Sequence, residues 1–262
     1  MSITLETVLN SYKTLPQVQA IAIGGSSIAH INDNLSDIDI EIFSSEPIPL
    51  QARENIAKSF SSKMDLNQDY FGPTDEYVVD ELGVQLDIAY WDVTWLENEV
   101  ESKWEQFNAS NGYTTCILYT IKNCKLFYDK NNWLKNLKQR LNTPYPDELA
   151  KSIIYRNMQL MNGKPFASYL EQIDKAMIRE DYNSVNHRLT AFMASYFDVI
   201  FAKNRMLHPG EKRLVKYALE NCSHLPTNFE EDVTNILAST YDDTLKVHLL
   251  NLLMNLRRFI EV

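Results

Sequence analysis

The segment DIDIEIF, residues 37–43, alternates acidic and apolar side chains, and this alternation constrains the fold more than any other feature of the chain. Because successive side chains of a β-strand point to opposite faces, Asp37, Asp39 and Glu41 would share one face and the isoleucines the other. The isoleucine face can pack into a core. The acidic face brings like charges within about 7 Å of one another, so it predicts either a solvated surface or a site where a metal ion supplies the countercharge.

A turn lies upstream of this acidic strand. The apolar run VQAIAI (18–23) predicts a strand, and Gly25 and Ser26 follow it closely. Glycine lets another group approach the backbone, and free amides at the start of a helix bind phosphate. We expect a short helix between this turn and the acidic strand. Phosphate donors beside paired carboxylates are the two halves of a site for metal-dependent phosphoryl transfer.

A third acid lies on a later strand. The segment EYVVDELGVQLDIAYWD (76–92) predicts two strands broken at DELG, which suits a hairpin. Asp87 lies between Leu86 and Ile88, so its side chain faces away from both of them. The chain therefore contains a Gly-Ser turn, an Asp-x-Asp strand and a third strand acid, in that order.

This order of motifs resembles the nucleotidyltransferases of the DNA polymerase beta superfamily. The residues that carry the resemblance are Gly25-Ser26, then Asp37 and Asp39 after ten intervening residues, and finally Asp87. Many members continue the turn with an arginine and a glycine, and the corresponding stretch here, residues 27–30, has neither. The resemblance therefore supports a role for the three aspartates in the site more strongly than it supports phosphate binding by the turn.

The resemblance implies transfer of a nucleoside monophosphate from a nucleoside triphosphate, with ATP expected, to a hydroxyl group, with release of pyrophosphate. It implies that Asp37, Asp39 and Asp87 are the catalytic residues and the ligands of two Mg²⁺ ions. Asp87 is also the first candidate for the general base. Glu41 is not a usual member of this set, and we expect it to lie behind the ligands or in solvent.

Three residues are predicted to bind the nucleotide. Gly25 and Ser26 would contact the β- and γ-phosphates through backbone amides and a hydroxyl. The segment FAKNRMLHPGEKRLVKYAL (201–219) loosely resembles a part of the streptomycin and spectinomycin adenylyltransferases in which a lysine after a proline reaches the phosphates. Lys212, three residues after Pro209, matches that lysine. A solvated lysine at the start of a surface helix is an equally good interpretation.

The hydrophobic pattern changes at NTPYPDEL (142–149). Strand patterns end there, and apolar residues then recur at helical spacing in segments 147–162, 165–180, 182–204, 209–222, 228–239 and 241–260. We predict an α+β fold in which a nucleotidyltransferase-type mixed sheet with flanking helices (1–140, catalytic) precedes an all-helical bundle domain (141–262). The predicted helix N-caps are Asp147, Asp181 and Thr227.

Charge and composition limit the partners. Residues 1–140 contain 11 Lys and Arg against 20 Asp and Glu, and an acidic half of this kind repels nucleic acid. No apolar run approaches the roughly 18 to 20 residues of a membrane span, and the N-terminus has no signal-peptide pattern. We expect a cytoplasmic protein with free thiols at its three cysteines, Cys116, Cys124 and Cys222.

The leading interpretation is an enzyme that resembles the antibiotic (aminoglycoside and lincosamide) adenylyltransferases and acts on a small hydroxyl-bearing molecule, in antibiotic resistance. An acidic cleft would attract a polycationic aminoglycoside. One alternative is a nucleotidyltransferase that modifies a tRNA or a protein, as in toxin–antitoxin pairs, although the C-terminal stretch offers only the basic pair Arg257-Arg258. A non-catalytic nucleotide-binding member is the other alternative, and the three retained carboxylates argue against it.

Overall fold

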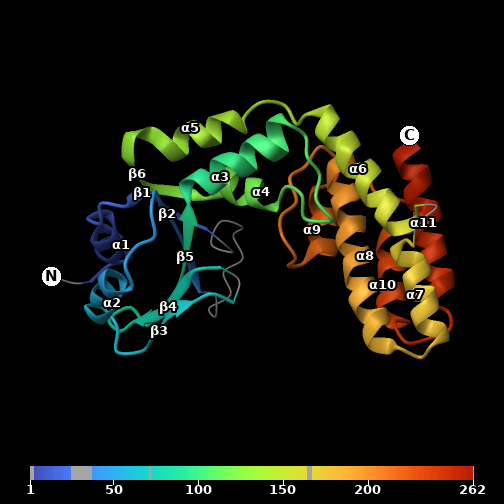
Figure 1. Ribbon diagram of the computed structural model, residues 1–262, viewed down its shortest axis with the longest axis horizontal. Coiled ribbons are helices and arrows are strands. Elements are labelled where there is room, and N and C mark those ends of the chain that lie inside the picture. The colour runs from blue at the N-terminus through green and yellow to red at the C-terminus, as the bar shows by residue number, and fades with distance from the viewer. Residues whose placement is uncertain (1–2, 25–36, 71, 164–166, 262) are drawn as a thin grey trace. The chain divides into compact units, whose positions relative to one another are not determined.

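The computed structural model describes residues 3–24, 37–70, 72–163 and 167–261, which form two compact units (Figure 1). The first, here called the sheet unit, consists of Met1–Glu101 and Thr120–Thr143. The second, the helical unit, consists of Ser102–Tyr119 and Pro144–Val262. The chain thus leaves the sheet unit at Glu101, returns at Thr120 and leaves it again after Thr143. The assignment of a catalytic role to one unit stays a prediction.

The sheet unit contains a six-stranded mixed sheet in the order β3-β4-β5-β2-β1-β6. Its strands are β1 (Val18–Ile23), β2 (Ile38–Ser44), β3 (Met64–Gln68), β4 (Thr74–Val79), β5 (Val84–Asp92) and β6 (Lys125–Asp129). β2 and β5 pair in parallel, and the other four described pairings are antiparallel. The predicted hairpin is present, with Val79 opposite Val84 across the DELG turn.

Helices cover this sheet, and one of its faces packs against the first two of them. The helices of this part of the chain are α1 (Leu5–Lys13), α2 (Leu50–Lys58), α3 (Val93–Val100), α4 (Cys116–Asn123) and α5 (Trp133–Arg140). Ile40 and Ile42 of β2 are buried with Leu86 and Ile88 of β5, in one cluster with apolar side chains of α1 and α2. The isoleucines of the acidic strand therefore face a core, as their alternation predicts.

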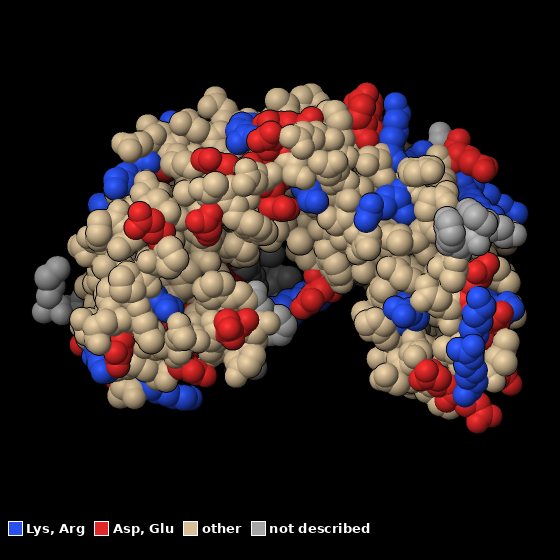
Figure 2. All heavy atoms as spheres, in the orientation of Figure 1, with Lys and Arg blue, Asp and Glu red and all other residues tan. Residues whose placement is uncertain are grey.

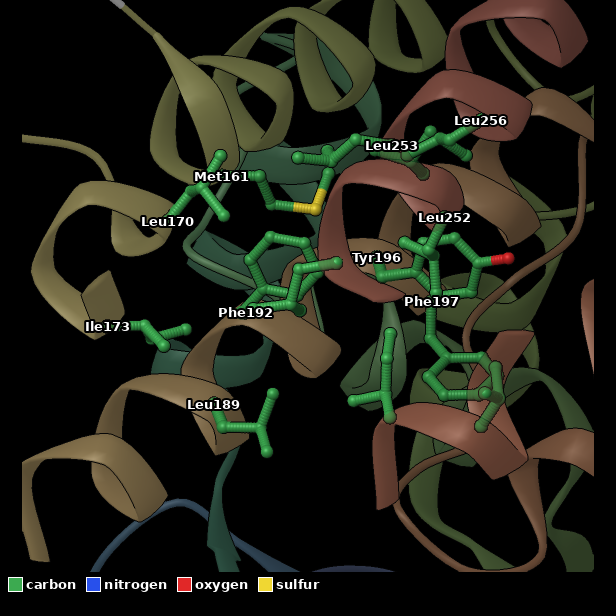
Figure 3. Close-up of a cluster of buried hydrophobic side chains, with 14 of the residues drawn as sticks. Met161, Leu170, Ile173, Leu189, Phe192, Tyr196, Phe197, Leu252, Leu253 and Leu256 are labelled. Atoms are coloured by element: carbon green, nitrogen blue, oxygen red, sulfur yellow. The ribbon is translucent and has the colours of Figure 1, made fainter. Parts of the chain in front are cut away.

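The described residues of the C-terminal part of the helical unit form the helices α6 (Asp147–Asn162), α7 (Tyr169–Ile178), α8 (Tyr182–Lys203), α9 (Leu214–Asn221), α10 (Phe229–Ala238) and α11 (Leu245–Glu261). Figure 3 shows their shared core, in which Phe192 and Tyr196 of α8 lie near Leu252 and Leu253 of α11. The predicted class, a mixed sheet with flanking helices and a helical C-terminal region, is confirmed.

One of the three N-caps predicted from the sequence is observed. Asp181 caps α8, and its side chain accepts a hydrogen bond from the Ser184 amide. Asp147 is instead the first residue of α6, after the N-cap Pro146, where its charge complements the helix dipole. The prediction of Thr227 is wrong, since α10 is capped by Asn228 at φ 57°, a left-handed conformation that asparagine tolerates well.

The surface carries charges of both signs, and the cysteines are present as thiols. On the face shown in Figure 2, acidic side chains lie among basic and uncharged ones across the sheet unit. None of the helices in the described ranges is long and apolar enough to cross a membrane. All three cysteines are free thiols, as predicted.

Candidate functional site

The parallel pairing of β2 with β5 places Asp39 directly beside Asp87. The same register pairs Ile40 with Ile88, and both of these isoleucines are buried. The two aspartates therefore lie on the opposite face of the sheet, on strands about 4.8 Å apart, and both are half-buried. Asp37, also half-buried, precedes β2 by one residue. The structure thus brings together two predicted ligands that are 48 residues apart in the sequence (87 minus 39).

Two further acids extend this pair across the sheet. Glu76 of β4 is the register partner of Asp87, and Asp65 of β3 is the register partner of Glu76. Since directly paired residues share a face, Asp39, Asp87, Glu76 and Asp65 form one row over four neighbouring strands, here called the acidic row. Glu76 and Asp65 were not predicted from the sequence. The predicted hairpin implies the position of Glu76, whereas the strand that carries Asp65 was not recognised.

The carboxylates of the acidic row repel one another. Burial raises the pKa of Glu76, and the charges of Asp87, Asp65 and Asp37 raise it further, in that order. Gln85 donates a hydrogen bond of 3.0 Å from Nε2 to Oδ1 of Asp87. Among the described residues, no lysine or arginine forms an ion pair with Asp65, Glu76 or Asp87. This face of the sheet therefore favours a cation.

Glu41 lies behind the row and not in solvent. It is buried, and its Oε2 accepts a hydrogen bond from Nε1 of Trp91 on β5. Burial raises the pKa of Glu41 to about 7, against the effect of the Trp91 hydrogen bond and with a further rise from Asp39. Of the two positions that the sequence left open for Glu41, the structure shows the buried one.

Gly24, the residue after β1, is hydrogen-bonded to β2 at this site. Its amide donates a hydrogen bond of 2.9 Å to the carbonyl of Asp39. A Cβ at residue 24 would lie 2.5 Å from Oε1 of Glu41, so a larger residue here would displace the buried Glu41 side chain. The chain that leads into Gly25 and Ser26 therefore starts beside Asp39. Gly25, Ser26 and the short helix predicted after them lie outside the described residues.

Lys212 lies in the helical unit, where it is exposed in the turn that precedes α9. The helix begins at Leu214, after the N-cap Arg213 in a left-handed conformation. Lys212 therefore precedes the helix instead of opening it, and its contact with phosphate stays a prediction.

The donor set fits a divalent cation of the Mg²⁺ class. Carboxylate oxygens are the ligands that such hard ions prefer, and Asp39 and Asp87 present them side by side. A cation there would also offset the repulsion that raises the pKa of Glu76. No group of three His, Cys, Asp or Glu in the described ranges is already arranged as a metal site. The fit therefore rests on the chemistry and the register of the donors.

Comparison with known proteins gives one family match and two similar structures. Residues 112–214, less than half of the chain, match a domain of unknown function (DUF4037). A nucleotidyltransferase-like protein from Exiguobacterium sibiricum is 11% identical over 97% of this chain and 72% of that chain, with a TM-score of 0.45. A STING-associated CdnE c-di-GMP synthase from Capnocytophaga granulosa is 16% identical over 98% of this chain and 78% of that chain, with a TM-score of 0.30. Both scores are below 0.5, and neither likeness supports a conclusion about activity. No curated protein matches the sequence.

Proposed function

We propose that this chain is a nucleotidyltransferase that moves a nucleoside monophosphate from a Mg²⁺-bound nucleoside triphosphate, ATP in the first place, to a hydroxyl group of a small, antibiotic-like molecule. The observation that carries the proposal is the in-register pairing of Asp39 with Asp87, on the face of the sheet opposite Ile40 and Ile88. The hydrogen bond from Gly24 to Asp39 supports it, because the residues predicted to bind phosphate, Gly25 and Ser26, follow Gly24 directly in the sequence.

In this proposal the carboxylates have separate roles. Asp37 and Asp39 would hold the ion that accompanies the triphosphate, and Asp39 and Asp87 would hold the second ion. Bound Mg²⁺ neutralises charge on the phosphates and lowers the pKa of a nearby hydroxyl. Asp87 accepts the proton of the acceptor hydroxyl, and Gln85, bonded to Oδ1, orients its carboxylate.

The reaction balances with these groups alone. The acceptor oxygen bonds to the α-phosphorus as its proton passes to Asp87, and the bond from the α-phosphorus to the bridging oxygen of the β-phosphate breaks. Pyrophosphate leaves with that electron pair. Gly25, Ser26 and Lys212 are the proposed contacts of the β- and γ-phosphates.

Product analysis tests the function directly. The protein is incubated with Mg²⁺, the four nucleoside triphosphates and a panel containing aminoglycosides, lincosamides, tRNA and protein, and the products are identified by mass spectrometry. A nucleotidylated antibiotic with stoichiometric pyrophosphate is the expected result. Labelling of tRNA or protein alone would replace the small acceptor by a macromolecular one, and no transfer to any acceptor would overturn the proposal.

Nucleoside triphosphate binding is expected to require a divalent cation. The acidic row repels the triphosphate until a cation neutralises the carboxylates. Calorimetric titration with ATP should therefore give at least about tenfold tighter binding with Mg²⁺ than with EDTA. Equal affinity in the two conditions would contradict the cation-dependent site.

Asp87→Asn is expected to lower kcat by at least about 10²-fold and to leave the affinity for nucleoside triphosphate within a few-fold. The reason is that Asp87 serves the acceptor side, whereas Asp37 and Asp39 hold the ion of the triphosphate. The Gln85 hydrogen bond can be kept by the amide oxygen, so the side chain keeps its orientation. Calorimetry and steady-state kinetics on one preparation separate the two effects, and a matching loss of ATP affinity would restrict Asp87 to metal binding.

A further inference from the structure

Apolar side chains lie on both the inner and the outer face of α11. The inner face supplies Leu252, Leu253 and Leu256 to the core of the helical unit (Figure 3). The outer face exposes Val247 by 57% and Leu250 and Met254 by 44% each. Spacings of three and four residues place these three side chains along one line of a helix. They are here called the outer stripe. A surface helix normally carries polar residues on this side, so the stripe favours contact with another molecule.

Charges of opposite sign flank the outer stripe at equal distances. Asp242 and Asp243 precede α11, and Arg257 and Arg258 lie near its end. All four are exposed. Leu250 stands seven residues after Asp243 and seven before Arg257, as their numbers show. Seven residues are close to two helical turns, so Arg257 faces the same way as Leu250. Asp242 and Asp243 lie in the turn at the other end of the helix.

We propose that the outer stripe docks on the outer stripe of a second copy of this chain, with the two α11 helices antiparallel about a two-fold axis at Leu250. This arrangement places Asp243 beside Arg257 of the partner subunit and Asp242 beside Arg258 of the partner subunit. A two-fold interface uses the same surface on both copies, so each of these contacts occurs twice.

The charges at the two ends of α11 favour a second copy of this chain as the partner and an antiparallel arrangement of the two helices. A parallel pair would bring arginines onto arginines and aspartates onto aspartates, which repel. The neighbouring cation Lys246 is paired with Asp174 at 2.8 Å, so its charge is offset where two copies approach. One helix face buries less than the about 800 Å² per partner of a standard interface, and we expect a dimer with a dissociation constant in the micromolar range. The proposal does not involve the acidic row and does not depend on the proposed function.

Charge reversal tests the pairing in both directions. Asp243→Lys places cations at both ends of the stripe, and Arg257→Glu places anions at both ends. Each variant alone is expected to dimerise at least about tenfold more weakly than the native protein, in sedimentation velocity across the micromolar range. An equimolar mixture should recover the native dimer as a heterodimer, because each introduced charge then meets its opposite. Asp242 is left unchanged, since its Oδ1 accepts the Thr244 amide at 2.7 Å beside the start of α11.

A matched pair of leucine variants tests the stripe itself. Leu250→Glu should abolish the dimer, since it places two carboxylates on the axis. Leu219→Glu makes the same change on α9 at a leucine of similar exposure, 46%, outside the stripe, and should leave the dimer intact. Melting curves followed by circular dichroism confirm that each variant is folded. A native protein that is monomeric throughout this range would overturn the proposal. So would a dimer that survives Leu250→Glu, or charge variants that do not dimerise when they are mixed.

Discussion

Replacing Asp39 by asparagine is expected to lower kcat/KM for nucleotidyl transfer by at least about 10³-fold. Asp39 is the one carboxylate shared by both proposed ions, and its neighbour Asp87 lies in direct register with it. The amide keeps the shape of the side chain but removes the negative charge that attracts a divalent cation. A loss of this size corresponds to about 4 kcal/mol of transition-state stabilisation. Initial rates of pyrophosphate release, measured over a range of ATP concentrations, give the value.

Asp65→Asn is the matched control. It makes the same chemical change in the same acidic row, but on β3, at the other end of the row from β2. Activity should stay within a few-fold, because Asp65 is not a proposed ligand. An equal loss in the two variants would mean that the total charge of the row matters and not the position of the carboxylate.

The stability of the Asp39→Asn variant separates a functional carboxylate from a structural one. Removing a charge from a like-charged group relieves repulsion with Asp87 and Glu41, whose pKa Asp39 raises. The free energy of unfolding in EDTA should therefore stay level or increase. A sharp fall would show that Asp39 is held by structural partners and was misassigned.

The position of a site residue was predictable where the pattern within a single strand is sufficient to assign its face. The alternation in DIDIEIF placed the acids of β2 on one face, and the same alternation around Asp87 placed it on the matching face of β5. The pairing of Glu76 with Asp87 was also within reach. A hairpin that turns at DELG pairs Val79 with Val84, and counting back along both strands brings Glu76 opposite Asp87. The parallel pairing of β2 with β5 has no such local signal.

The strands that were not predicted from the sequence are the two edges of the sheet. β3 (MDLNQ) and β6 (KLFYD) occupy the ends of the strand order, and each pairs with one neighbour. Edge strands are short and half-exposed, so their stability depends on the partner strand, β4 for β3 and β1 for β6, more than on their own residues. By contrast, the prediction of 18–23 matches β1 and that of 147–162 matches α6, where an apolar run or a periodic face is buried along its length.

A buried ion pair connects α2 to the sheet. Asp75 of β4 is buried on the core face of the sheet and accepts a hydrogen bond of 2.7 Å from Nη1 of Arg53 on α2. The same carboxylate accepts the Asn67 amide and the Tyr90 hydroxyl, each at 2.7 Å. Arg53 is itself buried and lies over the Tyr90 ring, 4.8 Å from its centroid. The arginine therefore balances a charge that water does not reach.

Arg53→Met is expected to lower the free energy of unfolding by about 3–5 kcal/mol, because it leaves the Asp75 carboxylate buried without a countercharge. Methionine keeps most of the aliphatic volume, so little of this loss is due to packing. Lys58→Met provides the control on the same helix: Lys58 pairs with Glu54 at 2.6 Å, but its side chain is 60% exposed, and the expected cost is below about 1 kcal/mol. Urea denaturation of both variants, followed by far-ultraviolet circular dichroism, measures the difference. Equal losses in the two variants would show that the buried pair is no more important than a surface ion pair, and that the hydrogen bonds from Asn67 and Tyr90 satisfy Asp75 without Arg53.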